Sequence, residues 1–241
     1  MPISETFVSI QGEGKLAGVP SLFVRVSGCN LRCRWCDTPY ASWQPEGGAR
    51  TIESIVEEAR AAAVRGVRHA VLTGGEPMMF AQLTELSARI AAPIGGGGAG
   101  MHVTIETAGT VIPDGGVTCD LMSISPKLSN STPRDDARDV SGAWAARHES
   151  RRINVPVLQR LIDEFPSRQL KFVVSAEGDA GEIDDLLGRL RGWKPEDVLV
   201  MPEGTPPARG HVDAAVKLCM ARGWRYCHRL HLKLFGNVRG T

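Results

Sequence analysis

Short apolar runs alternate with amphipathic stretches along most of this 241-residue chain, and this alternation restricts the possible folds more than any other feature. Runs such as 69–73 have the length of buried strands, whereas 51–65 carries apolar residues at the i, i+3, i+4 and i+7 positions of a helix. About six such alternations predict a parallel sheet with helical crossovers, and therefore an α/β fold. The expected strands are 21–26, 69–73, 102–105, 121–124, 171–174, 198–201 and 226–234, and the expected helices are 51–65, 80–90, 158–165, 183–190 and 212–219.

Two stretches interrupt this alternation. The glycine-rich stretch 95–100 is expected to be a flexible surface turn between a helix and a strand. The polar and charged stretch 129–152 is expected to be an insertion or a mobile loop. No linker or shift of composition divides the chain, so a single domain over 1–241 is predicted.

Charge and hydropathy exclude several classes of protein. Lys plus Arg is 28 and Asp plus Glu is 27, and this balance argues against a nucleic-acid binder held by charge, but it permits a small anionic ligand bound by one or two cations. No apolar run approaches the roughly 20 residues of a membrane helix, and the first residues lack the pattern of a signal peptide. Six cysteines are too few for a disulfide scaffold. We therefore expect a cytoplasmic protein with no nucleic-acid or membrane partner.

Three of the cysteines, Cys29, Cys33 and Cys36, stand in the spacing C-x3-C-x2-C directly after the first expected strand. Three thiolates in one loop suit a [4Fe–4S] cluster whose fourth iron stays open for chemistry. A zinc ion with a distant fourth ligand, such as His102 or Cys119, is an alternative, although structural zinc usually takes two separated ligand pairs. Three ordinary buried cysteines are a further alternative. The charged residues within the loop argue against ordinary buried cysteines, and the cluster is favoured over zinc because no partner pair of ligands follows.

This spacing resembles the signature of the radical S-adenosylmethionine (SAM) superfamily. In that superfamily, the open iron binds the amino and carboxylate groups of SAM, and an electron from the cluster cleaves SAM to methionine and a 5′-deoxyadenosyl radical. Members fold as full or partial (β/α)6 barrels. The resemblance therefore implies a partial or modified (β/α)6 barrel, with 1–241 forming one radical SAM core domain.

Further segments narrow the resemblance to the 7-carboxy-7-deazaguanine synthases, which contract a pterin ring in 7-deazapurine biosynthesis. These segments are 9–14, 23–29, 36–38, 72–77, 105–110, 125–127, 229–231 and 235–237. The resemblance runs from residue 5 to about 237, with a gap at 129–160. It implies conversion of 6-carboxy-5,6,7,8-tetrahydropterin to 7-carboxy-7-deazaguanine and ammonia, for queuosine and related nucleosides. It also implies regenerated SAM, Mg²⁺, an electron donor such as a flavodoxin or ferredoxin, and a homodimer.

The resemblance also assigns the residues of the site. No side chain is expected to be catalytic, because the cluster and SAM carry the chemistry. The cluster ligands are Cys29, Cys33 and Cys36, and the Mg²⁺ ligand is Thr38. The SAM contacts are Trp35, Asp37, Gly75, Ser125, Pro126 and Lys127, with Met201, Pro202, Glu203 and Gly204 around the adenine. The substrate contacts are Ile10, Gln11, Gly12, Glu13, Arg25, Thr73 and His231.

The chemistry of several of these residues suits the assigned roles. Gly74 and Gly75 end a strand and let backbone approach a ligand closely. Arg25 is suited to pair with a carboxylate, and the Thr38 hydroxyl is a hard ligand of the kind that Mg²⁺ takes. The family commonly has glutamine where Met201 stands, and its members often end in a proline whose carboxylate reaches the substrate, whereas this chain ends in Thr241.

Two other functions remain open at this point. A radical SAM activase, which makes a glycyl radical on a partner protein, shares the cysteine spacing and the Gly-Gly-Glu-Pro turn at 74–77. Activases lack the Gln-Gly-Glu-Gly segment at 11–14 and the threonine of Cys-Asp-Thr at 36–38. A binding module for an iron–sulfur cluster or zinc would leave the glycine turn unexplained.

Overall fold

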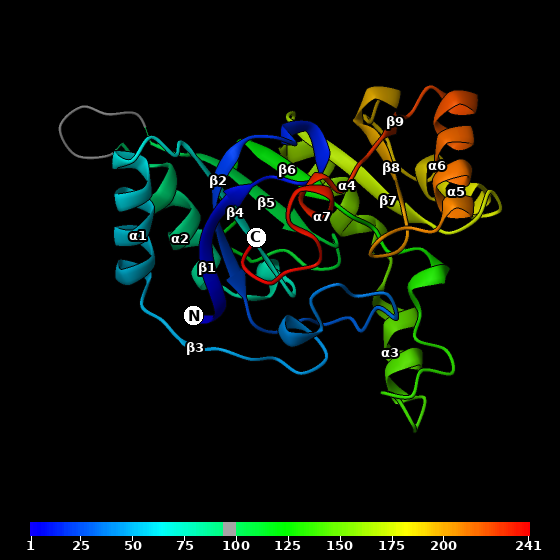
Figure 1. The fold of residues 1–241 in the computed structure, drawn as a ribbon, viewed down its shortest axis with the longest axis horizontal. Coiled ribbons are helices and arrows are strands. Elements are labelled where there is room, and N and C mark those ends of the chain that lie inside the picture. The colour runs from blue at the N-terminus through cyan, green and yellow to red at the C-terminus, as the bar shows by residue number, and fades with distance from the viewer. Residues whose placement is uncertain (94–99) are drawn as a thin grey trace.

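A curved nine-stranded sheet forms the centre of the computed structural model, which describes residues 1–93 and 100–241 (Figure 1). The strands lie in the order β3-β1-β2-β4-β5-β6-β7-β8-β9, with β2 to β9 parallel and β1 antiparallel to both of its neighbours. They are β1 (Pro2–Ile10), β2 (Pro20–Val26), β3 (Gly48–Ala49), β4 (His69–Gly74), β5 (His102–Thr107), β6 (Leu121–Ile124), β7 (Arg168–Val174), β8 (Val198–Pro202) and β9 (Arg225–Tyr226). The edges β3 and β9 do not pair, so the α/β fold with a partial barrel is confirmed.

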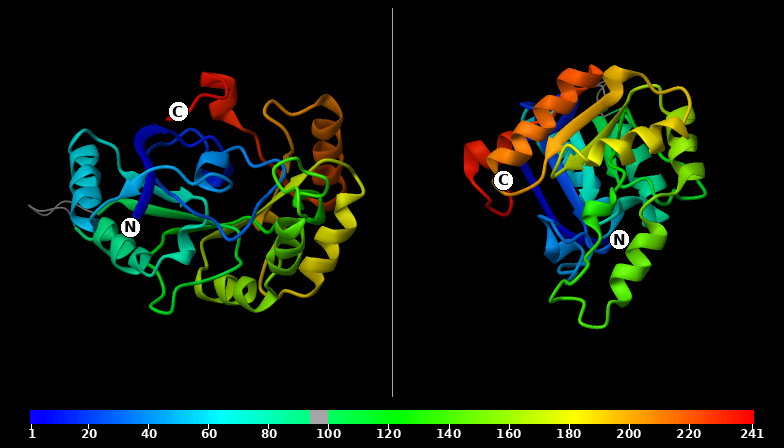
Figure 2. Two further views of the ribbon diagram at one scale, coloured as in Figure 1. Left: turned by 90° about the horizontal axis from the view of Figure 1, so that it is seen from below. Right: turned by 90° about the vertical axis from the view of Figure 1, so that its right-hand side faces the viewer.

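Helices cover the outer side of this sheet as an arc, while the C-terminal segment lies on its inner side (Figure 2). Two helices, α3 (Ala143–Arg151) and α7 (Leu230–Phe235), lie outside this arc. The helices of the arc are α1 (Ile52–Val64), α2 (Gln82–Ala91), α4 (Val155–Glu164), α5 (Asp179–Gly188) and α6 (Arg209–Arg222). Their apolar stripes bury residues such as Ile55, Leu83 and Leu158 against the sheet. No helix in the described ranges combines the length and apolar character needed to cross a bilayer.

The alternation of side chains along each strand separates the core from the site. Val24, Leu72, Ile105, Phe172 and Val200 point outward into the core beneath the helices. Neighbouring residues of a strand face opposite sides of the sheet. The residue directly before or after each of these core residues therefore points to the inner side. These inner residues are Arg25, Thr73, Glu106, Lys171 and Met201.

The prediction of a strand at 226–234 is wrong. Only Arg225–Tyr226 pairs with β8, and Leu230–Phe235 is the helix α7. The leucines at every second position from 230 to 234 imitate a strand, but here the chain leaves the sheet. It crosses the inner side instead, where the Leu230 N–H donates to the Gly12 carbonyl at 2.8 Å.

The stretch 129–152 contains a short 3-10 turn (Ser129–Ser131), a loop and the helix α3, which projects from one end of the barrel (Figure 1). Helix α3 packs against the cysteine loop through His148, whose side chain is fully buried. Mobility of this stretch and the single-domain division stay predictions. Apart from Gly100, the turn expected at 95–100 lies outside the described residues.

Candidate active site

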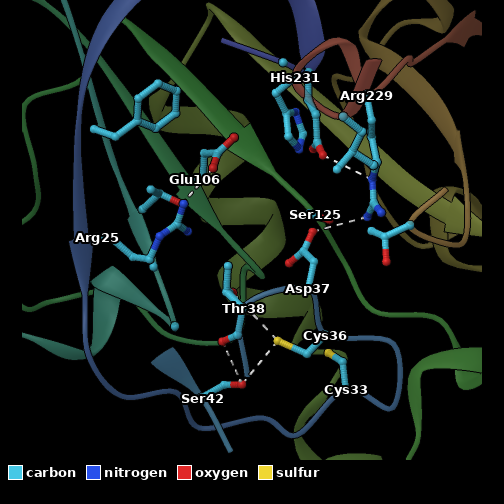
Figure 3. Close-up of a pocket in the computed structure, with 18 of the residues that line it drawn as sticks. Arg25, Cys33, Cys36, Asp37, Thr38, Ser42, Glu106, Ser125, Arg229 and His231 are labelled. Carbon is cyan, nitrogen blue, oxygen red and sulfur yellow. Dashed lines mark hydrogen bonds and ion pairs between the residues drawn. The ribbon is translucent and has the colours of Figure 1, made fainter. Parts of the chain in front are cut away.

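One cavity of about 560 Å³ opens on the inner side of the sheet, at the carboxyl ends of the parallel strands. Figure 3 shows Cys33 and Cys36 at its base, Arg25 and Glu106 on one wall, and Arg229 and His231 on the opposite wall. Of the residues expected in the site, those lining the cavity are Ile10, Gln11, Gly12, Glu13, Arg25, Cys29, Cys33, Trp35, Cys36, Asp37, Thr38, Thr73, Gly75, Ser125, Lys127, Met201 and His231. Pro126, Pro202, Glu203 and Gly204 belong to the same strand ends but do not contribute to the lining.

The cysteine loop and the glycine turn after β4 touch through their backbones. The Gly28 N–H donates to the Ala41 carbonyl at 2.8 Å, which closes the loop on itself. A Cβ on Gly75 would lie only 2.0 Å from the Gly28 carbonyl oxygen. Glycine is therefore required at position 75 by packing against the cysteine loop, quite apart from any ligand.

The donor set of the loop fits a cluster better than a single zinc ion. Three thiols line one side of the cavity, yet no group of three His, Cys, Asp or Glu within the described residues converges on one metal ion. His102 begins β5, at the end of the strand away from the cavity, and the Cys119 thiol donates to the Val103 carbonyl there. Neither can complete a zinc site with the loop, and three spaced thiols match ligands to separate irons.

Burial raises the pKa of two thiols of the loop, Cys29 and Cys33. Desolvation, with a further contribution from Glu76, raises the pKa of Cys29 to about 12. Desolvation likewise raises the pKa of Cys33. Metal binding to such thiols must release protons, because the thiolate is the ligand.

Glu76 ties the ends of β4 and β5 together beneath the cavity. Its fully buried carboxylate accepts hydrogen bonds from the Met78 N–H at 3.1 Å, the Thr107 hydroxyl at 2.8 Å and the Ala108 N–H at 2.8 Å. Burial raises the pKa of this carboxyl group despite these bonds. The glutamate of the Gly-Gly-Glu-Pro turn therefore has a structural role.

Lys127, Ser125 and Trp35 meet on the wall next to the cysteine loop. The Lys127 Nζ donates to the Ser125 carbonyl at 2.7 Å and to its hydroxyl at 2.8 Å, and it lies 5.8 Å from the centre of the Trp35 ring. Trp35 also packs on a small apolar cluster that contains Met201 and Leu199. This wall joins a cation and a hydroxyl to an apolar surface suited to a flat ring.

Four charged side chains that line the cavity form a network of ion pairs. The Glu13 carboxylate pairs with the Lys171 ammonium group and lies 3.3 Å from Arg229 Nε, while Arg229 Nη2 lies 3.4 Å from Asp37 Oδ2. Desolvation alone would raise the pKa of Glu13, but Lys171 and Arg229 outweigh it and lower that pKa to about 2. The pKa of Lys171 is raised by Glu13 against its own desolvation.

A second charged group surrounds Arg25. Its Nε donates to Glu5 Oε1 at 2.7 Å, and the same carboxylate accepts from the Tyr40 hydroxyl at 3.0 Å and from Arg239 Nε at 3.1 Å. Desolvation opposes ionisation of Glu5, yet Arg25 and the other donors lower its pKa. Glu5 thus orients Arg25, and it also anchors the C-terminal segment, whose residues 236–241 line the cavity.

The segment 11–14 and the C-terminal helix build one wall together. A Cβ on Gly12 would lie 1.8 Å from His231 Nδ1, so the imidazole rests on bare backbone. Desolvation lowers the pKa of His231, although Glu13 and Asp37 oppose the change. Gln11 is buried and donates to the Ser21 hydroxyl at 2.8 Å.

Thr38 lies beside the last cysteine, with 3.8 Å between its Oγ1 and Cys36 Sγ. It precedes the 3-10 turn Pro39–Ala41, and within the described chain its hydroxyl makes no capping bond to that turn. A plain capping role is therefore not supported, and Thr38 is one of the residues that line the cavity.

Sequence reasoning missed three polar residues of the strands and the C-terminal wall: Glu106, Lys171 and Arg229. Glu106 accepts from the Thr73 hydroxyl at 2.7 Å. The signal that could have found Glu106 and Lys171 is their place in otherwise apolar parallel strands. A charge there must be paired or face a cavity.

Comparisons with known proteins agree with this geometry. Residues 23–120 match the Radical SAM superfamily. A 7-carboxy-7-deazaguanine synthase of Rhodopirellula baltica is 45% identical over 99% of this chain and 88% of its own, and one of Halobacterium salinarum is 43% identical over 100% and 93%. The crystal structure of QueE from Escherichia coli is similar with a TM-score of 0.64, at 26% identity over 95% of this chain and 94% of that one.

Proposed function

Since the chain belongs to the 7-carboxy-7-deazaguanine synthase family of the radical SAM superfamily, we propose that it converts 6-carboxy-5,6,7,8-tetrahydropterin to 7-carboxy-7-deazaguanine and ammonia. The main structural support is that the cysteine loop, the glycine turn and the polar strand ends line a single cavity. The named relatives favour this synthase over an activase.

The cysteine loop and the neighbouring wall form the cofactor half of the cavity in this proposal. When bound by Cys29, Cys33 and Cys36, a [4Fe–4S] cluster supplies the electron that cleaves SAM. The wall of Lys127, Ser125 and Trp35 supports this, because it offers a cation and a hydroxyl for the carboxylate of SAM.

The remaining contacts to SAM follow from the same wall. Gly75 and Asp37 border the space between the wall and the loop. Met201 offers an apolar face to the adenine in place of a polar contact. The course of the backbone at the two strand ends would be the contribution of Pro126, Pro202, Glu203 and Gly204, since these residues lie outside the lining.

Arg25 is our candidate for the carboxylate of the pterin. Its side chain is only 15% exposed, and Glu5 fixes the guanidinium through Nε. A guanidinium held at one edge can still offer paired N–H groups to a second carboxylate. The polar ring of the pterin would be bordered by Thr73 with its partner Glu106, and by Ile10, Gln11 and Gly12. Glu13 and His231 would lie on the opposite wall.

Thr38 is our candidate ligand for Mg²⁺. A single neutral hydroxyl cannot hold the ion alone, because Mg²⁺ prefers several oxygen ligands. We expect the ion to bind together with the substrate's oxygens, and to orient the ring.

The partners belong to the same proposal. A one-electron donor such as a flavodoxin or ferredoxin would reduce the cluster, and two chains would form a homodimer. All six cysteines are free, in keeping with the reducing cytoplasm.

An anaerobic assay separates the candidate functions. The reconstituted protein is incubated with SAM, Mg²⁺, dithionite and the carboxypterin, and the product is identified by mass. A new mass for 7-carboxy-7-deazaguanine supports the proposal. Cleavage of SAM without that product would favour an activase, and no cleavage by a protein with intact iron would favour a binding module.

A further inference from the structure

The stretch 129–152 holds the middle cysteine of the loop from both sides. The Arg34 N–H donates to the Ser131 carbonyl at 2.9 Å, and the Arg32 N–H donates to His148 Nδ1 at 3.1 Å. Cys33 lies between these two amides, and its own carbonyl accepts from Trp43 Nε1 at 3.0 Å. The same carbonyl also accepts from the Cys36 N–H at 3.3 Å, so four hydrogen bonds fix the backbone around Cys33.

The partners of His148 define its protonation. A backbone N–H only donates, so Nδ1 must be the acceptor and the ring proton must lie on Nε2. The Ser131 hydroxyl, 2.8 Å from Nε2, accepts that proton because it donates its own to the Leu128 carbonyl at 2.6 Å. Desolvation, together with Arg152, lowers the pKa of His148 to about 4, in keeping with a neutral ring.

These hydrogen bonds form a chain, called the relay below, that connects the cysteine loop with the turn 125–127. The relay runs from the Arg32 N–H through His148 and Ser131 to the Leu128 carbonyl. Leu128 directly follows the turn 125–127, which carries Ser125 and Lys127 on the cavity wall. Helix α3 reinforces the contact, because the Arg32 guanidinium lies 4.0 Å from the centre of the Trp144 ring.

We propose that His148 is a positioning residue, which sets the cluster loop at Cys33 against the SAM-contacting turn 125–127 through its neutral imidazole. The inference rests on the proposed function, since it takes that turn as a contact of SAM. It gives the stretch 129–152 a role in aligning the cofactor, although none of its residues lines the cavity.

The first test uses the metal-free protein. In His148→Leu, the Arg32 amide loses its acceptor, and its hydrogen exchange should rise about tenfold, which corresponds to about 1.4 kcal/mol. His148→Asn places an amide oxygen near the position of Nδ1, so it should retain most of the protection. The control is Thr132→Val, because Thr132 is equally buried in the same stretch but bonds Glu149 instead of the relay.

The second test uses the reconstituted protein. SAM binding is followed by the change that SAM causes in the electron paramagnetic resonance spectrum of the reduced cluster. His148→Leu should weaken SAM binding about tenfold, His148→Asn less, and Thr132→Val not at all, while the KM for the carboxypterin stays near the parent value. If the Leu variant does not fold, Ser131→Ala, which breaks the relay at the next bond, should weaken SAM binding instead.

The inference is overturned if His148→Leu keeps the parent's Arg32 exchange and SAM affinity, or if Thr132→Val loses as much as the relay variants do. It is also overturned if a folded Ser131→Ala protein, standing in for an unfolded Leu variant, binds SAM as the parent does. The exchange and SAM-binding readouts do not require the deazaguanine product. Failure of the parent to form that product would therefore reject the proposed function separately.

Discussion

The buried carboxylate of Glu13 offers the sharpest quantitative prediction, through the substitution Glu13→Gln. Glu13 compensates Lys171 and Arg229, whose side chains are only 9% and 6% exposed. An amide of the same shape removes the negative charge that faces both cations, and the buried Lys171 ammonium group loses its ion pair. Breaking a buried pair in this way is costly because the remaining charge stays desolvated.

The pKa of Glu13 sets the size of the effect. A pKa lowered from 4.5 to about 2 in the folded protein corresponds to about 3 kcal/mol of folding free energy at neutral pH. Because the pKa is lowered on folding, this stabilisation is complete above pH 4.5 and is lost as the pH falls toward 2. Between pH 7 and pH 4, Glu13 should account for a loss of about 1 kcal/mol.

Urea unfolding of the metal-free protein, followed by tryptophan fluorescence, measures both quantities. Glu13→Gln should lower the free energy of unfolding by about 3 kcal/mol at pH 7, and its further loss at pH 4 should be smaller than the parent's. The control is Glu53→Gln, which breaks a surface pair with Arg89. Salt should abolish the control's small effect but not that of Glu13. A Glu13→Gln protein as stable as the parent at both pH values would refute the network.

Three further substitutions test the site. Cys33→Ala should abolish iron binding and SAM cleavage, whereas Cys219→Ala, which lies in the core, should retain both; full iron content in Cys33→Ala would rule out the three-thiolate ligand set. Arg25→Ala should weaken binding of the carboxypterin by about 2–5 kcal/mol, measured by titration, with little change for SAM; an equal loss for both ligands would make Arg25 a support of the cysteine loop. Thr38→Ala should lose the stimulation of product formation by Mg²⁺ while keeping SAM cleavage in its absence, and a parent-like response to Mg²⁺ would remove Thr38 from the metal site.

The fold was largely predictable because its parallel strands are buried and bounded by glycine, proline or polar residues. The strand 69–73, for example, was expected within one residue of His69–Gly74. The error at 226–234 arose because alternating leucines fit a strand and a short helix equally well, and only contacts with distant residues such as Gly12 decide between them. Strand β1 was not predicted from the sequence, because its residues are mostly half-buried and show no alternation of buried and exposed positions.

The site was predictable where it follows the chain and not where it depends on tertiary pairing. Cys29, Cys33 and Cys36 lie in one loop, so their spacing alone indicated a common ligand. Glu5 and Arg239 come from opposite ends of the chain and meet only in the folded protein. The same holds for His148, which the sequence left inside a polar stretch and the structure buries against the cysteine loop.

The ratio of product to SAM shows whether the protein makes the deazaguanine and regenerates SAM in each turnover. With SAM limiting and the carboxypterin in excess, 7-carboxy-7-deazaguanine and 5′-deoxyadenosine are both quantified by mass after anaerobic turnover. Because SAM is regenerated, we expect many equivalents of 7-carboxy-7-deazaguanine for each SAM, with little 5′-deoxyadenosine. Formation of one 5′-deoxyadenosine for each turnover, or SAM cleavage with no deazaguanine at all, would contradict it.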